Sequence, residues 1–176
     1  MSVITNQENR NETKPSQKQL PDPADYCLIL SQLDAVTENE NNVIANLANA
    51  SSVLNMNLEQ INWVGFYLAQ KDRLILGPFQ GKPACVRIAF GKGVCGTAAA
   101  MAATQLVANV HTFPGHIACD GASNAEIVVP LMHDGKVVAV LDIDSPLPGR
   151  FTEADQKGLE ACAALLAERC QWNTLS

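Results

Sequence analysis

The 176-residue sequence predicts a single α+β domain, with a central antiparallel sheet, helices packed on one face, and a ligand pocket under loops on the other. Three observations support this fold class. Apolar residues recur at helical spacing mainly near the two ends of the chain, strand-like segments fill the middle, and an Asp-Gly step joins the last two of them. Hydrophobic residues make up 47% of the chain, enough for one packed core.

The longer helices are predicted at the ends of this domain. Residues 24–58 carry apolar side chains at helical spacing with a break near residues 39–42, so two helices are expected there. Thr152 and Asp155 form a capping-box pair that predicts the start of a last helix. One apolar stripe runs along that helix, formed by Leu159, Cys162, Ala163, Leu166 and Cys170.

The strands are predicted between these helices. They cover residues 61–69, 74–79, 85–90, 126–132 and 136–144, and Asp134-Gly135 joins the last two as a hairpin. Residues 94–103 predict a short helix and residues 105–110 a brief strand. Residues 111–125 form a long loop, and long loops inside compact domains are often functional.

Composition narrows the class of protein. Residues 1–22 are polar and are expected to form a disordered or loosely docked tail, which leaves residues 23–176 as the domain. The net charge of −6, without a basic cluster, argues against nucleic acid and anionic membranes as partners. No apolar run reaches the roughly 18–20 residues of a membrane span, and no secretion signal is visible. A cytoplasmic location is therefore expected.

Three of the six cysteines have an ordinary structural explanation. They lie in helical segments among apolar residues: Cys27, Cys162 and Cys170. Free cysteine is among the most frequently buried residue types, and a reducing compartment disfavours a structural disulfide framework. We therefore expect these three thiols in the core.

The other three cysteines, Cys85, Cys95 and Cys119, lie in or beside the glycine-rich middle of the chain. Cys95 stands at the expected start of a helix, where the helix dipole and free N–H groups lower the pKa of a thiol. Cys119 lies in the long loop, whose N–H groups could also point at it. Each thiol alone could be a small buried hydrophobe, but the three together indicate redox chemistry.

A zinc site is the competing explanation for these cysteines. Together with His111 or His116 they would form a Cys₃His ligand set. The chain has no C-x₂-C pair, and the separations of 10 and 24 residues are not the usual spacing of structural zinc sites. No metal is therefore expected.

Three carboxylates accompany the thiols in the predicted hairpin. Glu126 opens one strand, while Asp142 and Asp144 close the other on the same face as Val138 and Val140. An exposed strand end would explain the two aspartates less well, although that alternative stays open. In a shared pocket, like charges and partial burial would raise the pKa of at least one carboxyl and keep a proton donor near neutral pH.

Two aromatic residues complete the candidate site. Trp63 and Tyr67 share one face of a predicted strand, with Gly65 between them. A glycine at this place leaves a hollow of ligand size, or else it marks a bulge in an ordinary packed core.

Four segments of the chain resemble the free methionine-R-sulfoxide reductases, which are GAF-domain enzymes: INWVGFYL, FQGKPACVRIAFGKGVCG, VHTFPGHIACDGASNAEIVVPL and GKVVAVLDIDSP. The resemblance covers roughly residues 25–172, and no motif position departs from it. It implies a GAF-like domain, a possible homodimer, and reduction of free methionine-R-sulfoxide as part of oxidative stress repair.

The resemblance also implies roles for individual residues. It makes Cys119 the catalytic thiol and Cys85, with Cys95 as a second candidate, the resolving thiol. It assigns substrate binding and acid catalysis to the three carboxylates, Glu126, Asp142 and Asp144. It also implies that the two aromatic residues, Trp63 and Tyr67, form the wall around the methyl group of the substrate.

Sulfoxide chemistry extends these roles into an expected mechanism. Cys119 attacks the sulfur while Glu126 or Asp144 donates a proton to the oxygen, and the thiol becomes a sulfenic acid. Cys85 then forms a disulfide, which thioredoxin reduces by exchange, without a metal or an organic cofactor. Asp142 would bind the substrate ammonium, and N–H groups of residues 115–119, including Ile117 and Ala118, its carboxylate.

A small-molecule sensor is the alternative function, since GAF domains commonly bind small regulatory ligands. The sequence shows no kinase, cyclase or DNA-binding domain to regulate, and a sensor does not need three cysteines beside a carboxylate cluster. The enzyme is therefore the favoured interpretation.

Overall fold

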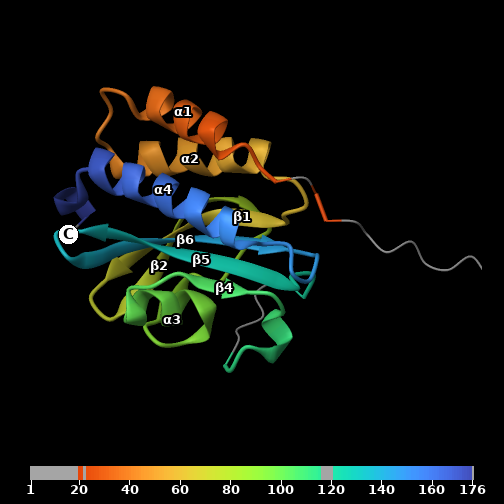
Figure 1. The fold of residues 1–176 in the computed structure, drawn as a ribbon. Helices are drawn as coiled ribbons and strands as arrows, with labels where there is room; N and C mark the ends of the chain where they lie inside the picture. The colour runs from red at the N-terminus through yellow and green to blue at the C-terminus, as the bar shows by residue number, and fades with distance from the viewer. Residues whose placement is uncertain (1–19, 22, 116–120, 176) are drawn as a thin grey trace, which may run out of the picture.

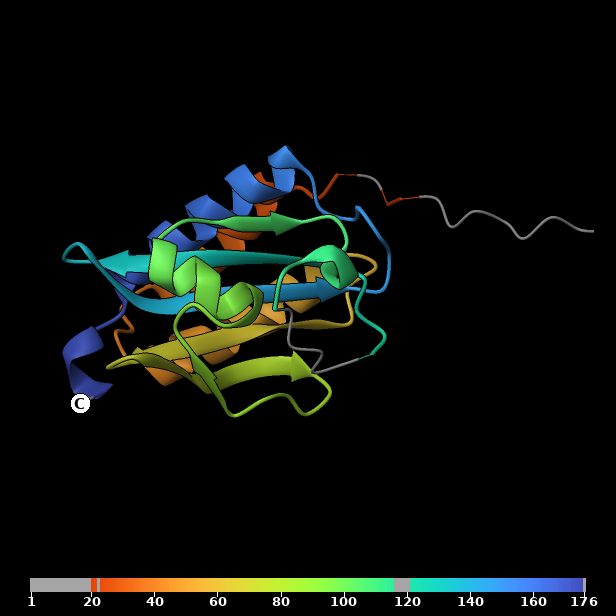
Figure 2. The same cartoon turned by 90° about the horizontal axis from the view of Figure 1, so that it is seen from below.

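The computed structural model describes residues 20–21, 23–115 and 121–175. Within these residues the chain forms one antiparallel sheet with helices on both sides (Figures 1 and 2). The helices are α1 (Tyr26–Thr37), α2 (Val43–Asn57), α3 (Gly93–Met101) and α4 (Glu153–Arg169). The strands are β1 (Trp63–Gln70), β2 (Arg73–Gly81), β3 (Arg87–Ala89), β4 (Gln105–Val107), β5 (Ala125–His133) and β6 (Lys136–Ser145). Two 3₁₀ turns, η1 (Val110–Thr112) and η2 (Trp172–Leu175), complete the described elements.

The sheet has the strand order β3-β2-β1-β6-β5-β4, so β1, β6 and β5 lie side by side in its middle. Every neighbouring pair is antiparallel. The hairpin between β5 and β6 turns at Asp134 (φ 49°) and Gly135 (φ 71°). Two successive residues with positive φ match the right-handed twist of the strands, which explains the Asp-Gly signal in the sequence.

Three helices lie on one side of the sheet: α2 and α4 pack on the strands, and α1 packs on α2 and α4 (Figure 1). The main core lies between these helices and the strands and includes Leu33, Leu47, Phe66, Leu141 and Leu166. The predicted capping box at the start of α4 is present, because Thr152 and Asp155 bond to each other's backbone N–H groups. The predicted fold class is thus confirmed.

The fourth helix, α3, lies on the opposite face, below the sheet in Figure 1. Its Val94, Cys95 and Ala98 pack in a second cluster with Tyr67 and Val140. Small residues permit this packing. A Cβ atom on Gly96 would lie 2.3 Å from the Ala89 carbonyl oxygen, so only glycine allows α3 to approach β3 so closely. The helices therefore lie on both faces, which corrects the expectation of helices on one face only, and α3 forms one wall of the predicted pocket.

Two local predictions are wrong, and a third overestimates the length of a strand. Cys27 is exposed rather than buried, because Ile29 and Leu33 form the buried stripe of α1. Val138 packs with the helix-covered core, since an irregularity in the β5–β6 register changes which side chains face the pocket. The third strand is also shorter than expected and spans only Arg87–Ala89.

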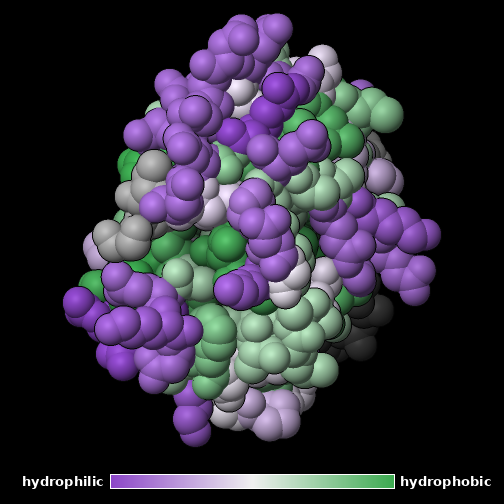
Figure 3. Space-filling model, turned by 90° about the vertical axis from the view of Figure 1, so that its left-hand side faces the viewer, coloured by the Kyte–Doolittle hydropathy of each residue, from purple (hydrophilic) through white to green (hydrophobic). Residues whose placement is uncertain are grey.

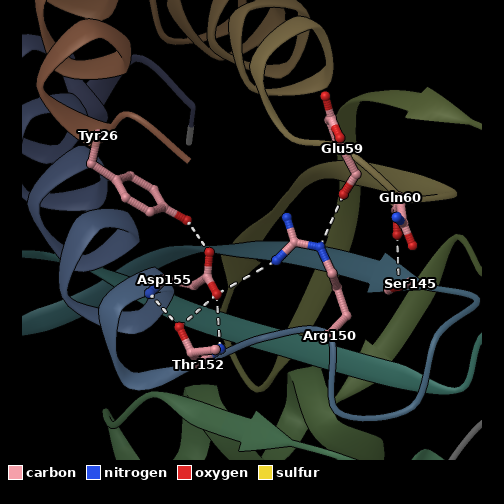
Figure 4. A network of polar contacts seen from close by, with 7 residues as sticks. All are labelled: Tyr26, Glu59, Gln60, Ser145, Arg150, Thr152 and Asp155. Atoms are coloured by element: carbon pink, nitrogen blue, oxygen red, sulfur yellow. Dashed lines mark hydrogen bonds and ion pairs between the residues drawn. The ribbon is translucent and has the colours of Figure 1, made fainter. Parts of the chain in front are cut away.

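A buried polar network joins the helix layer to the end of the sheet (Figure 4). Asp155 accepts hydrogen bonds from the Tyr26 hydroxyl (2.8 Å) and the Thr152 backbone N–H (2.8 Å), and it pairs with Arg150 at 3.5 Å. Arg150 also donates to the Glu59 carbonyl oxygen at 2.9 Å. Burial and the Asp155 carboxylate raise the pKa of Tyr26, which keeps the phenol protonated as a donor.

The surface seen from the left of Figure 1 carries mixed hydrophilic and hydrophobic side chains (Figure 3). Pale green residues gather in its lower part, at the height of the alanine-rich α3. None of the described helices is long and apolar enough to cross a membrane.

Candidate active site

The register of the three central strands builds the core of the candidate site. On the pocket face, Trp63 of β1 lies opposite Asp144 of β6, and Asp144 lies opposite Glu126 of β5. Asp142 lies two residues before Asp144 on the same strand, so its side chain points to the same face. An aromatic ring and three carboxyl groups thus meet on adjacent strands, as the alternation pattern predicts.

A cavity opens above this row of side chains, with about 590 Å³ of empty space when the solvent at its open mouth is included. It is lined by all five described strand residues that the sequence singled out: Trp63, Tyr67, Glu126, Asp142 and Asp144. Cys95 of α3 closes its other wall. The structure therefore brings these predicted site residues together in one pocket.

The two innermost carboxyl groups are deeply buried, since Glu126 and Asp142 are each 6% exposed. Burial, followed by repulsion from Asp142 and Asp144, raises the pKa of Glu126 well above its usual range. Burial also raises the pKa of Asp142, to about 6. The expected rise of at least one carboxyl pKa is confirmed, and the rise favours the protonated form of Glu126.

Cys95 differs from its prediction. Its Sγ lies 3.9 Å from Oε1 of Glu126, and the side chain is 4% exposed. Burial raises its pKa, and the neighbouring Asp142 and Glu126 carboxylates raise it further. The expectation of a lowered pKa is wrong, because desolvation and nearby negative charge outweigh the dipole of a nine-residue helix. Cys95 is thus a protonated thiol in this arrangement.

The aromatic wall is packed more tightly than the sequence suggested. The rings of Trp63 and Tyr67 lie 6.0 Å apart, and Phe79 of β2 stacks on Trp63 at 5.3 Å. A Cβ atom on Gly65 would lie 2.3 Å from Cβ of Phe79, so this space is filled and is not a hollow. The β1–β2 register also shifts between Gly65 and Tyr67, which is the bulge that the sequence left as the alternative.

Several pocket residues carry no clear sequence signal. They are Lys82, Pro83, Ala84, Ile88, Lys92 and Ser123. Lys92 could have been found, since it stands between two turn-forming glycines, three residues before Cys95. Ser123 is buried and accepts a hydrogen bond from Asn62 at 3.0 Å, a contact between segments 61 residues apart that no local pattern reveals.

The remaining thiols have different states. Cys85 is disulfide-bonded, whereas Cys95, Cys162 and Cys170 are free and buried. The burial of Cys162 and Cys170 confirms their assignment to the core. Other predicted site residues lie outside the described part of the chain, so the structure leaves their roles as predictions: Ile117, Ala118 and Cys119.

The structure locates one of the two histidines that the zinc alternative needs. His111 is exposed, its Nε2 lies 2.9 Å from Oδ1 of Asn124, and it does not line the cavity. His116 lies outside the described residues. Among those described, the group with metal-ligand geometry consists of Cys95, Glu126 and Asp142, whose ligand atoms lie within 4.8 Å of one another. This set differs from the Cys₃His set considered in the sequence.

The chain is similar to proteins of one family over most of its length. The family model of the GAF domain matches residues 37–168. YtsP of Bacillus subtilis is 56% identical over 144 residues, which cover 81% of this chain and 88% of that protein. The free methionine-R-sulfoxide reductase of Escherichia coli is 51% identical over 141 residues, which cover 80% of this chain and 86% of that protein.

The solved structures give the same result. The reduced form of a Staphylococcus aureus protein called fRMsr has a TM-score of 0.84 and 51% identity, covering 87% of this chain and 99% of that chain. A second structure of fRMsr, described as a complex with substrate, has a TM-score of 0.82. The sheet, the pocket and the matched length agree, and the chain belongs to the GAF-domain family of free methionine-R-sulfoxide reductases.

Proposed function

We propose that this protein reduces free methionine-R-sulfoxide to methionine, with Cys119 as the attacking thiolate and Cys85 as the resolving thiol. One observation carries the proposal: in a chain of this reductase family, buried acids and an aromatic wall share one pocket with a thiol. This arrangement suits a ligand that has a cationic end, an apolar end and an oxygen atom that must be protonated.

The pocket has complementary groups for each part of the substrate. Asp142 is the partner for the α-ammonium, and the rings of Trp63 and Tyr67 contact the methyl end. The α-carboxylate binds N–H groups of Ile117 and Ala118. A methionine sulfoxide within a protein has neither charge, and the pocket rejects it because its buried polar groups would lose their partners.

Glu126 supplies the proton that the sulfoxide oxygen needs. Its raised pKa leaves it protonated near neutral pH, whereas Asp144 is less buried and serves as the alternative donor. Attack by Cys119 on the sulfur transfers the oxygen to the thiol, so methionine leaves and a sulfenic acid forms. The substrate is thereby reduced by two electrons, and Cys119 is oxidised by two electrons.

The sulfenic acid then condenses with a second thiol. Cys85 attacks the sulfur of the Cys119 sulfenic acid, water leaves, and a disulfide forms. The disulfide-bonded state of Cys85 and the free thiol of Cys95 support Cys85 as the resolving residue. A thioredoxin-type dithiol takes up the disulfide by exchange and returns both thiols.

An assay with three substrates tests this proposal. Free R-sulfoxide, free S-sulfoxide and a peptide-bound sulfoxide are each offered with thioredoxin, thioredoxin reductase and NADPH, and only the free R form should be reduced. Cys119→Ser should remove activity, while Cys85→Ser should form about one methionine per chain and then stop. Cys27→Ser, at an exposed thiol away from the pocket, is the control. Full activity of Cys119→Ser would overturn the mechanism.

A further inference from the structure

We propose that Cys95, Glu126 and Asp142 also form a binding site for a thiophilic divalent cation such as Zn²⁺, which competes with substrate for the pocket. The site goes beyond the proposed function, because reduction of the sulfoxide needs no metal. The three residues come from α3, β5 and β6, so regular secondary structure holds each of them in place.

One pair of ligand atoms already lies close to the spacing that a tetrahedral ion needs. One ligand atom from each residue lies within 4.8 Å of the other two, and Sγ of Cys95 is 3.9 Å from Oε1 of Glu126. Zn–S bonds of about 2.3 Å and Zn–O bonds of about 2.1 Å place neighbouring ligand atoms about 3.4–3.6 Å apart. The Cys95–Glu126 pair therefore has to close by only a few tenths of an ångström.

An unpartnered oxygen gives independent support for a ligand here. Asp142 is 6% exposed, lines the cavity, and its Oδ1 has no hydrogen-bond partner. A buried carboxylate oxygen without a partner is costly, and a bound cation would satisfy it. The other observation, the convergence of three ligand atoms, does not depend on this one.

The ligand chemistry selects the kind of ion. A thiolate with two carboxylates favours Zn²⁺ or Cd²⁺ over Mg²⁺, which prefers oxygen ligands only. Three protein ligands leave a fourth position for water at the open side of the cavity. Binding releases protons from the ligands and replaces repulsion among acidic groups by attraction to a shared charge. Because the same acids would bind substrate, ion and substrate exclude each other.

Binding is best measured on the full chain in its disulfide form, in which Cys85 offers no thiolate. Titration calorimetry with Zn²⁺ should show one tight site per chain, and Cd²⁺ should give the ultraviolet charge-transfer absorption of a cadmium thiolate. Cys95→Ser should abolish that absorption and weaken Zn²⁺ binding about 100-fold or more. Asp142→Asn should also weaken it, with thermal unfolding confirming that each variant is folded.

Two controls separate this site from other ligands on the chain. Cys27→Ser removes an exposed thiol, and His133→Ala removes a half-exposed imidazole that lies 3.6 Å from Asp134. Neither should change the affinity. Loss of binding in His133→Ala, or unchanged binding in Cys95→Ser, would overturn the proposal.

A last measurement tests the competition. Free methionine-R-sulfoxide should weaken Zn²⁺ binding to the wild-type chain in proportion to its concentration. The same sulfoxide with its amino and carboxyl groups both blocked as amides has no terminal charges and should not. Binding of both ligands at once would refute the shared site. Since metal binding is measured without turnover, failure of the reductase activity would leave the cation result interpretable.

Discussion

Two regions of the molecule bury carboxyl groups, and they do so in opposite ways. Asp155 is 4% exposed and is held by Arg150, the Tyr26 hydroxyl and Thr152 (Figure 4). Glu126 lies instead beside Asp142, and each is 6% exposed. One acid is neutralised by a cation and hydrogen bonds, while the other two face each other and a thiol.

The difference separates a structural device from a binding site. A buried ion pair with its hydrogen bonds completed ties elements together, here α1, α4 and the segment before β1. Buried like charges destabilise the fold until a proton or a cationic ligand arrives, and this is why perturbed pKa values gather at functional sites. The comparison predicts that mutations in the two regions will affect different measurements.

The largest effect is expected in the structural region. Asp155→Ala leaves the guanidinium of Arg150 buried without its partner, and the free energy of unfolding should fall by about 3–5 kcal/mol. Urea denaturation followed by circular dichroism measures this, and the activity per folded molecule should stay close to wild type. A stable Asp155→Ala protein without activity would break the comparison.

The next effect belongs to the pocket. Glu126→Gln keeps the shape but removes the acid, so kcat/KM for the free sulfoxide should fall about 100-fold, or about 2.7 kcal/mol. The free energy of unfolding should change by less than about 1 kcal/mol. If the variant instead loses stability and keeps its rate, Glu126 is structural and the proposed acid role fails.

A smaller effect should appear in the pH dependence of stability. The raised pKa of Asp142, about 6, means that the folded chain holds a proton that the unfolded chain releases near pH 4. Stability should therefore fall as the pH rises from about 4 through 6, by an amount on the order of 1–3 kcal/mol. Asp142→Asn should flatten this part of the profile in denaturation curves, whereas an unchanged profile would mean that Asp142 is ionised without penalty.

The smallest effect is expected at the exposed thiol of α1. Cys27→Ser should change the free energy of unfolding by less than about 0.5 kcal/mol and leave turnover unchanged. Cys162→Ser, at a fully buried position in the core, provides the matched contrast and should destabilise the protein. Equal effects of the two substitutions would show that the assignment of buried and exposed cysteines is wrong.

The fold was predictable where local patterns decide it. Helical spacing located α1, α2 and α4, and the Asp-Gly step located the β5–β6 hairpin. Strict alternation placed Asp142 and Asp144 on one face, and this face proved to be the pocket. Such patterns repeat within a few residues, so they can be read along the chain.

The errors arose where distant segments meet. The side of the sheet taken by α3 depends on glycines that permit close packing, and the space above Gly65 is filled by Phe79 from the neighbouring strand. The pKa of Cys95 depends on acids 31 and 47 residues away in the sequence, as its contacts with Glu126 and Asp142 show. No local pattern contains this information.

The row from Trp63 through Asp144 to Glu126 has a consequence for how the protein is assembled. Side chains alternate along a strand, so a slip of one residue in β6 would turn Ile143 into the pocket and both aspartates toward the helices. The two-residue turn at Asp134 and Gly135, together with the register shift between Leu131 and Met132, sets this register from the far end of the hairpin. Correct pairing of this hairpin therefore also assembles the reactive groups, and a one-residue slip would separate them.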